Sequence, residues 1–336
     1  MRKSSLIKAA IIIYSSLIII IGGALFYILE TDEYASVELP IAPTDPVVSD
    51  LELQEQVQRI QGTPSVAIKR PEHLDESEQQ TNHVQPVMST WQKNAAHWDK
   101  AAGPKIAIVI DDLGLAEDAS FALAEMEGPY TLSFLPYAEH LEKQTHLVKK
   151  AGHELFVHMP MEPKTDADPG PHALLVTLTP SEFEQRVDWN LSRFEGFVGV
   201  NNHMGSLMTE QAAPMVRLMV HLSKGGFVFL DSLTSPDSVA ERAALATGVP
   251  VLSRDIFLDN ERTMQAILEQ LVKTERIAQE RGYAIAIGHP YDETLKALEF
   301  WRAGLKAKNI NLVPISEIYA EELAKVEKHA AHQGHN

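Results

Sequence analysis

The sequence lacks several groups that define whole classes of protein. No cysteine occurs in its 336 residues, which excludes disulfide bonds, cysteine-ligated zinc, iron–sulfur clusters and a thiol nucleophile. No Gly-rich phosphate loop follows an apolar run and no G-x-S-x-G motif occurs, which disfavours nucleotide binding and serine hydrolysis. Basic residues are few, 29 against 46 acidic ones. The resulting net charge of -17 argues against binding to nucleic acid phosphates, so we expect no nucleic acid partner.

One long apolar segment lies near the start of the chain. Residues 9–29 carry no charged side chain, and about 20 such residues in a helix span a bilayer core. Basic residues precede the segment and acidic residues follow it, which predicts a cytoplasmic N-terminus. The alternative is a cleaved signal peptide with a site near Ala35 and Ser36. We expect residues 1–30 to be a cytoplasmic stub and a single anchor in the inner membrane, with the rest in the periplasm or outside the cell.

The next segment, residues 31–103, is rich in proline and acidic side chains and shows no sustained apolar periodicity. Such a composition predicts a disordered, flexible linker that holds the following domain away from the membrane. At the other end of the chain, residues 324–336 form a tail that predicts either a frayed terminus or a metal-capturing segment. Its histidines are His329, His332 and His335.

Residues 104–323 alternate apolar runs with amphipathic segments, which is typical of parallel strands covered by helices. Seven or eight such units predict an α/β domain in the form of a distorted (β/α) barrel, with an open doubly wound sheet as the alternative. We expect strands at 105–110, 130–135, 153–157, 197–200, 227–230, 251–252, 283–287 and 311–313. We expect helices at 117–127, 138–151, 180–194, 210–224, 239–247, 263–281, 293–303 and 316–323.

Titratable side chains follow several of these strands, where sites form in parallel α/β folds. Asp111 and Asp112 end the first strand, and His158, His203 and His289 follow three others. Each of them taken alone also fits a structural role, as a turn former or a buried histidine. Together they make a ligand set suited to zinc or a similar divalent metal, with a position left open for water.

Five short segments appear in order along this domain: IVIDDLG, GHELFVHMPMEP, VNNHMGS, FLDS and AIGHP. They resemble the divergent polysaccharide deacetylases, distant relatives of the chitin and peptidoglycan N-deacetylases. The resemblance covers residues 104–323 and implies a distorted barrel, a divalent metal and hydrolysis of acetyl groups. It further implies that Asp111 is the general base, that Asp112 is a metal ligand, and that His289 protonates the leaving amine.

The sequence also departs from that family pattern. Four residues after His158 the pattern has a second histidine, where this sequence has Glu162. We therefore expect Asp112, His158 and His203 to hold the metal, with Glu162 as an alternative third ligand or a neighbour of the ligands. An arginine that holds the substrate in the classical enzymes is absent from VNNHMGS. Three further residues at strand ends are expected to contact the substrate or support the ligands: Asn202, Asp231 and Arg254.

Two functions follow from these features. The first is a membrane-anchored, metal-dependent hydrolase that removes acetyl groups from a cell-envelope polysaccharide. The alternative is a non-catalytic, deacetylase-like module that binds or scaffolds components of the envelope. An acetylated glycan is the expected partner of the hydrolase.

Overall fold

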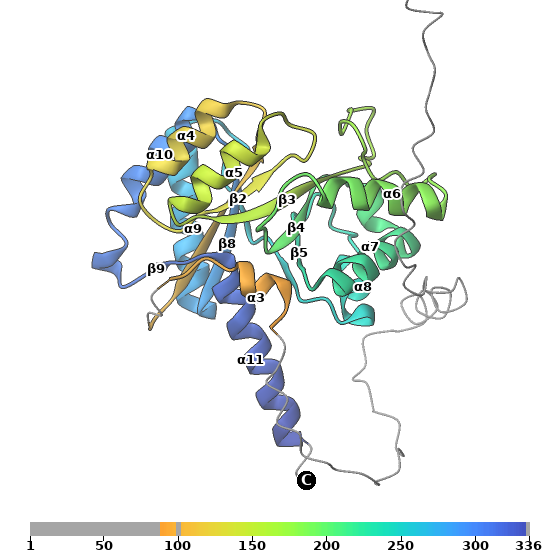
Figure 1. Cartoon of the computed structure of the whole chain (residues 1–336). Helices are drawn as coiled ribbons and strands as arrows, with labels where there is room; N and C mark the ends of the chain where they lie inside the picture. Colours follow the sequence, from red (N-terminus) through yellow and green to blue (C-terminus); the bar gives the residue numbers. More distant parts are fainter. Residues whose placement is uncertain (1–87, 99–101, 334–336) are drawn as a thin grey trace, which may run out of the picture. The chain divides into compact units, whose positions relative to one another are not determined.

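The computed structural model describes residues 88–98 and 102–333, which contain a parallel sheet flanked by helices (Figure 1). The predicted anchor, residues 9–29, and most of the predicted linker lie outside these residues. Among the helices of the described part, none has the length and apolarity needed to cross a bilayer.

Strands and helices alternate along the chain as the sequence predicts. The strands are β1 (Lys105–Leu113), β2 (Thr131–Phe134), β3 (Glu154–Met161), β4 (Gly199–Met204), β5 (Val228–Asp231), β6 (Val251–Ser253), β7 (Ile256–Phe257), β8 (Tyr283–Gly288) and β9 (Asn311–Leu312). The helices are α3 (Thr90–Asn94), α4 (Glu117–Glu125), α5 (Leu141–Lys150), α6 (Pro180–Leu191), α7 (Ala212–Gly225), α8 (Ala240–Thr247), α9 (Met264–Arg281), α10 (Asp292–Arg302) and α11 (Ile315–Gln333). Short 3-10 turns lie at Met208–Glu210 and Lys306–Lys308.

Local sequence signals place the helix ends. The α6 helix begins at Pro180 behind a capping box, in which Thr179 and Glu182 each accept a hydrogen bond from the other's backbone N–H. The α7 and α9 helices are followed by Gly226 and Gly282, which cap them in the left-handed conformation that glycine accepts without steric cost. The chain therefore turns back into the sheet after each helix.

The sheet curls on itself. Its strand order is β6-β5-β4-β3-β2-β1-β8-β7, with parallel pairing throughout and β9 beside β1. The two ends of this order, β6 and β7, are consecutive in the chain and separated only by Arg254 and Asp255. The backbone N–H of Arg254 donates to the carbonyl of Asp231 in β5, and the backbone N–H of Asp255 donates to the carbonyl of Ile285 in β8.

This short connection decides between the two predicted architectures. Consecutive Cα atoms are 3.8 Å apart, so the three steps from Ser253 to Ile256 span at most about 11 Å. An open doubly wound sheet would hold its outer strands much farther apart. The curled parallel sheet therefore fits the predicted distorted (β/α) barrel.

The chain upstream of Pro104 also contributes to the fold, although residues 31–103 were expected to form a flexible linker throughout. The α3 helix inserts Trp91, only 5% exposed, into the core beside Tyr319 of α11. The Trp91 backbone N–H donates a hydrogen bond to the carbonyl of Gly226, and the Asn94 side chain donates one to the carbonyl of Phe197. The two tryptophans of this polar segment, Trp91 and Trp98, gave no periodic signal, so sequence reasoning missed this helix.

We expect Trp91→Ala to lower the free energy of unfolding by about 3–5 kcal/mol, because it empties a large site in the core. Trp98→Ala is the matched control, since Trp98 lies in the same segment but is 40% exposed. It should cost less than about 0.5 kcal/mol. Urea unfolding of the 336-residue chain, followed by circular dichroism, measures both; equal losses would contradict docking of this segment.

The last helix runs farther than predicted. It continues from Ile315 to Gln333, so most of the expected tail, residues 324–336, is helical. Within it the His329 ring lies 2.8 Å from the carbonyl oxygen of Lys325, one helical turn earlier. His335 lies outside the described residues.

Candidate metal and catalytic site

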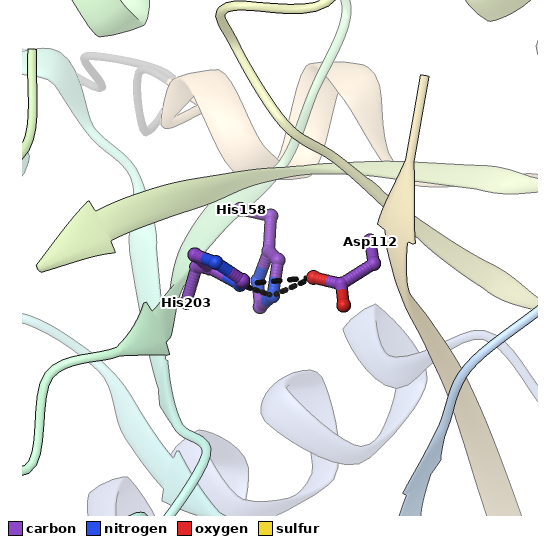
Figure 2. A group of neighbouring side chains, drawn as sticks. All are labelled: Asp112, His158 and His203. Atoms are coloured by element: carbon purple, nitrogen blue, oxygen red, sulfur yellow. Dashed lines mark hydrogen bonds and ion pairs between the residues drawn. The ribbon is translucent and has the colours of Figure 1, made fainter. Parts of the chain in front are cut away.

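Three of the predicted ligands meet at the carboxyl ends of the strands. The Asp112 Oδ1 atom lies 2.9 Å from His203 Nδ1 and 3.2 Å from His158 Nε2. The two histidine nitrogens are 3.2 Å apart. Figure 2 shows the three side chains converging from β1, β3 and β4.

Strand register explains why the two histidines share a face of the sheet. His158 of β3 is paired with Asn201 of β4, and His203 lies two residues beyond Asn201. Side chains alternate between faces along a strand, so Asn201 and His203 point to the same side and Asn202 to the other. The histidines are therefore diagonal neighbours on one face.

A backbone kink brings both aspartates to that face. Neighbours along an extended strand point to opposite sides, so Asp111 and Asp112 could both reach the site only if the chain turned. Asp112 adopts a left-handed φ of 57°, and the pairing of β1 with β2 shifts register between Ile110 and Leu113. A non-glycine residue in this region costs of order 1–3 kcal/mol, which is typical of functional sites.

The three ligand atoms fit a divalent metal. Asp112 Oδ1 is buried, and its approaches to the two histidines lack hydrogen-bond geometry, so it has no hydrogen-bond partner. Ligands at about 2.0–2.1 Å from tetrahedral zinc are about 3.3 Å from one another, close to the observed separations. An unpaired buried carboxylate oxygen beside two imidazole nitrogens is a donor set that zinc prefers.

The charges of this group shift its acid–base behaviour. Burial opposes ionisation of Asp112, yet the adjacent imidazole rings of His158 and His203 hold the pKa of its carboxyl well below the usual range. Burial alone would lower the pKa of His158, but the carboxylates of Asp111 and Asp112 raise it. Asp112 and His158 thus stabilise each other's charged forms.

Asp111 lies beside the ligands and is 3% exposed. Its Oδ1 accepts a hydrogen bond of 2.8 Å from the Asn201 side chain, and its Oδ2 is 3.7 Å from His158 Nε2. Burial raises the pKa of the carboxyl, although His158 and His289 act in the opposite direction. A carboxylate with a raised pKa is a better proton acceptor than an exposed aspartate.

His289 directly follows the end of β8 and lies beside Asp112. Its Nε2 lies 3.7 Å from Asp112 Oδ2, while its Nδ1 is 3.0 Å from Oδ1 of the fully buried Asp259. The other Asp259 oxygen accepts hydrogen bonds from the His289 backbone and from Thr294. Burial would lower the pKa of His289, but Asp259 and Asp111 raise it.

Sequence reasoning missed Asp259 and Asn201 as site residues. Asp259 follows β7, a strand of two residues that was too short to be predicted from periodicity. Asn201 stands beside Asn202 in the same motif, and the sequence alone favoured Asn202. The alternation of side chains along β4 is the signal that separates the two.

The remaining predicted residues lie near the site but do not join the ligand group. Glu162 uses its carboxylate to accept a hydrogen bond of 2.7 Å from the backbone of Val176, so the structure does not bring it in as a third ligand. It organises the loop after β3 instead. Glu162 lies one residue beyond the end of β3, where its carboxylate is held by the backbone of the loop that follows.

Asn202, Asp231 and Arg254 all support the loop after β5. Asn202 Oδ1 accepts from Ser232 N at 2.8 Å, and Asp231 Oδ1 accepts from Leu233 N at 2.9 Å. The Arg254 guanidinium donates to the carbonyls of Ser232 and Leu233 and lies over the Phe257 ring. These contacts explain a supporting role for the three residues.

Comparison with known proteins finds one matching family and several similar proteins. A profile described as divergent polysaccharide deacetylase matches residues 108–319. YibQ of Escherichia coli is 33% identical over 195 residues, which cover 58% of this chain and 61% of YibQ. A Haemophilus influenzae protein is 33% identical over 225 residues, covering 66% of this chain and 79% of that protein. The crystal structure of ATU2773 from Agrobacterium tumefaciens superposes with a TM-score of 0.67 at 28% identity, over 68% of this chain and 95% of that one.

Proposed function

This chain belongs to the divergent polysaccharide deacetylase family, and we propose that its barrel is a metal-dependent hydrolase that removes acetyl groups from a cell-envelope polysaccharide. One observation carries the proposal: Asp112, His158 and His203 converge, with Asp111 and His289 on two sides of them. A ligand group flanked by a candidate base and a candidate acid has the parts that hydrolysis of an amide or ester requires.

The three ligands would hold a divalent cation, and zinc suits their oxygen and nitrogen donors best. Such an ion supplies Lewis acidity that polarises a carbonyl group and lowers the pKa of water. His158 and His203 would keep Nε2 and Nδ1, respectively, unprotonated toward the ion, and Asp112 would contribute Oδ1.

The proton transfers fall to the two flanking residues. Hydrolysis adds water to the acetyl carbonyl carbon and breaks its bond to the sugar nitrogen or oxygen, so acetate and an amine or alcohol leave. Asp111 would accept the proton that water loses, since its Oδ2 is the oxygen not bonded to Asn201. His289 would give a proton to the leaving group from Nε2, because Nδ1 faces Asp259. Asp259 is thereby a positioning residue for the acid.

Release of acetate tests this proposal. The 336-residue chain, stripped of metal with a chelator and reloaded with zinc, is incubated with N-acetylglucosamine oligomers and with acetylated peptidoglycan fragments. We expect acetate release only after reloading. A folded chain that binds zinc and releases no acetate from any of these glycans would instead favour the non-catalytic binding or scaffolding module.

We also propose that the chain is anchored in the inner membrane through residues 9–29, with the barrel in the periplasm. The support is the uncharged length of this segment and the basic residues before it. A protease added outside the intact inner membrane should cut within residues 31–87 and release the barrel from the membrane fraction. Immunoblotting of both fractions measures this outcome; a barrel cut only after the membrane is lysed would contradict the orientation.

A further inference from the structure

Asn201 of β4 is a fully buried amide at the centre of the site. Its Oδ1 lies 3.1 Å from His158 Nδ1 and also accepts a hydrogen bond from the Ser133 hydroxyl. Its Nδ2 donates to Asp111 Oδ1 at 2.8 Å and to Ser232 Oγ at 3.1 Å. All four hydrogen-bonding positions of this side chain are used.

The surroundings fix which way the amide points. The NH₂ group of Asn201 faces Asp111 Oδ1, a carboxyl oxygen that accepts its hydrogen bond at 2.8 Å. The flipped amide would set its oxygen against that carboxyl oxygen, and two acceptors would repel each other. The oxygen must therefore face His158 and Ser133.

This orientation dictates the tautomer of His158. A carbonyl oxygen accepts hydrogen bonds and cannot donate them, so the neutral imidazole must carry its proton on Nδ1. The lone pair is then on Nε2, the atom that lies 3.2 Å from both Asp112 Oδ1 and His203 Nδ1. The same amide turns Asp111 so that Oδ2 is left for the reaction.

We propose that Asn201 is the positioning residue that sets the metal-binding tautomer of His158 and the orientation of Asp111 together. The inference rests on the proposed function for the role of Asp111, whereas its statement about His158 stands on the hydrogen bonds alone. A single side chain thus links metal binding to proton acceptance. Partners of metal-binding histidines typically change metal affinity 10–100-fold when they are removed.

Three variants of the 336-residue chain separate the two tasks. Asn201→Ala removes the hydrogen bond to His158 and the hydrogen bond to Asp111. Asn201→Asp has nearly the same shape and keeps an oxygen for His158, but it sets a second oxygen against Asp111. Ser232→Ala is the matched control, because it removes one neighbour of the amide and leaves both key bonds in place.

The first measurement is the tautomer of His158 in the metal-free chain, read by long-range ¹⁵N–¹H NMR with labelled histidine at a pH where the ring is neutral. The signal is identified by its loss in His158→Ala. We expect the Nδ1–H form in the unsubstituted chain, in Asn201→Asp and in Ser232→Ala, and a mixture in Asn201→Ala. A purely structural asparagine would change thermal stability without changing this tautomer.

The second measurement is zinc affinity by chelator competition, together with turnover. Asn201→Ala should bind zinc 10–100-fold more weakly. Asn201→Asp should bind it within about tenfold of the unsubstituted chain and lose turnover at least 100-fold. An unchanged His158 tautomer with unchanged zinc affinity in Asn201→Ala overturns the inference. A chain without any deacetylase activity would defeat the proposed function but leave the tautomer and affinity results to decide the role of Asn201.

Discussion

Asp111→Asn and His289→Ala should each reduce turnover of an acetylated glycan by roughly 10²–10⁴ while zinc affinity stays within about tenfold. Neither side chain belongs to the converging ligand group, so removing it leaves the three ligand atoms in place. Asparagine keeps the shape of Asp111 but cannot accept the proton of water. Alanine removes the imidazole that Asp259 orients toward the site.

Acetate release and zinc competition on the same preparations measure this pair of effects. Asp118→Asn and His146→Ala are suitable controls, because both side chains are exposed on helices and neither belongs to the converging ligand group. A His289→Ala chain that melts earlier but hydrolyses the glycan at the normal rate would make His289 a packing residue. Normal turnover in Asp111→Asn would remove the proposed base.

His158→Ala and His203→Ala should abolish metal binding and turnover together. Each substitution removes one of three protein ligands and leaves the buried Asp112 Oδ1 with one imidazole neighbour. A ligand that binds only the folded state stabilises it by about 2.7 kcal/mol at 100 times its Kd. Zinc should therefore raise the melting temperature of the unsubstituted chain and leave that of either variant unchanged.

The histidine-containing tail needs its own control in that experiment. Replacing His329, His332 and His335 together by alanine should leave the zinc-dependent stabilisation intact, since none of them belongs to the ligand group among the described residues. Loss of stabilisation in the tail variant, with retention in His158→Ala, would place the metal outside the barrel and contradict the proposed centre.

The order of strands and helices in the barrel could be read from the sequence. Apolar runs of strand length separated by amphipathic segments carry their periodicity in neighbouring residues, so no distant contact is needed to detect them. Asp112, His158 and His203 likewise stand at the ends of predicted strands, where sites form in parallel α/β folds. The family motifs lie at the same strand ends, and the matching profile covers residues 108–319.

Features that depend on contacts between distant segments could not be predicted from the sequence. β7 has only two residues, so its sequence carries no periodic signal. Asp259, which follows β7, lies beside His289 because β7 pairs with β8. Trp91 packs in a core cluster with residues far from it in the chain, among them Tyr319 of α11.

The sequence by itself determined the alternating α/β pattern, the family and the strand ends that carry the titratable residues. The tertiary structure decided which neighbours at those ends face one another. The left-handed backbone of Asp112 turned two adjacent aspartates to one side, and strand register selected Asn201 over Asn202. Composition and spacing are local properties, whereas the direction of a side chain depends on pairing and backbone torsion set by the whole barrel.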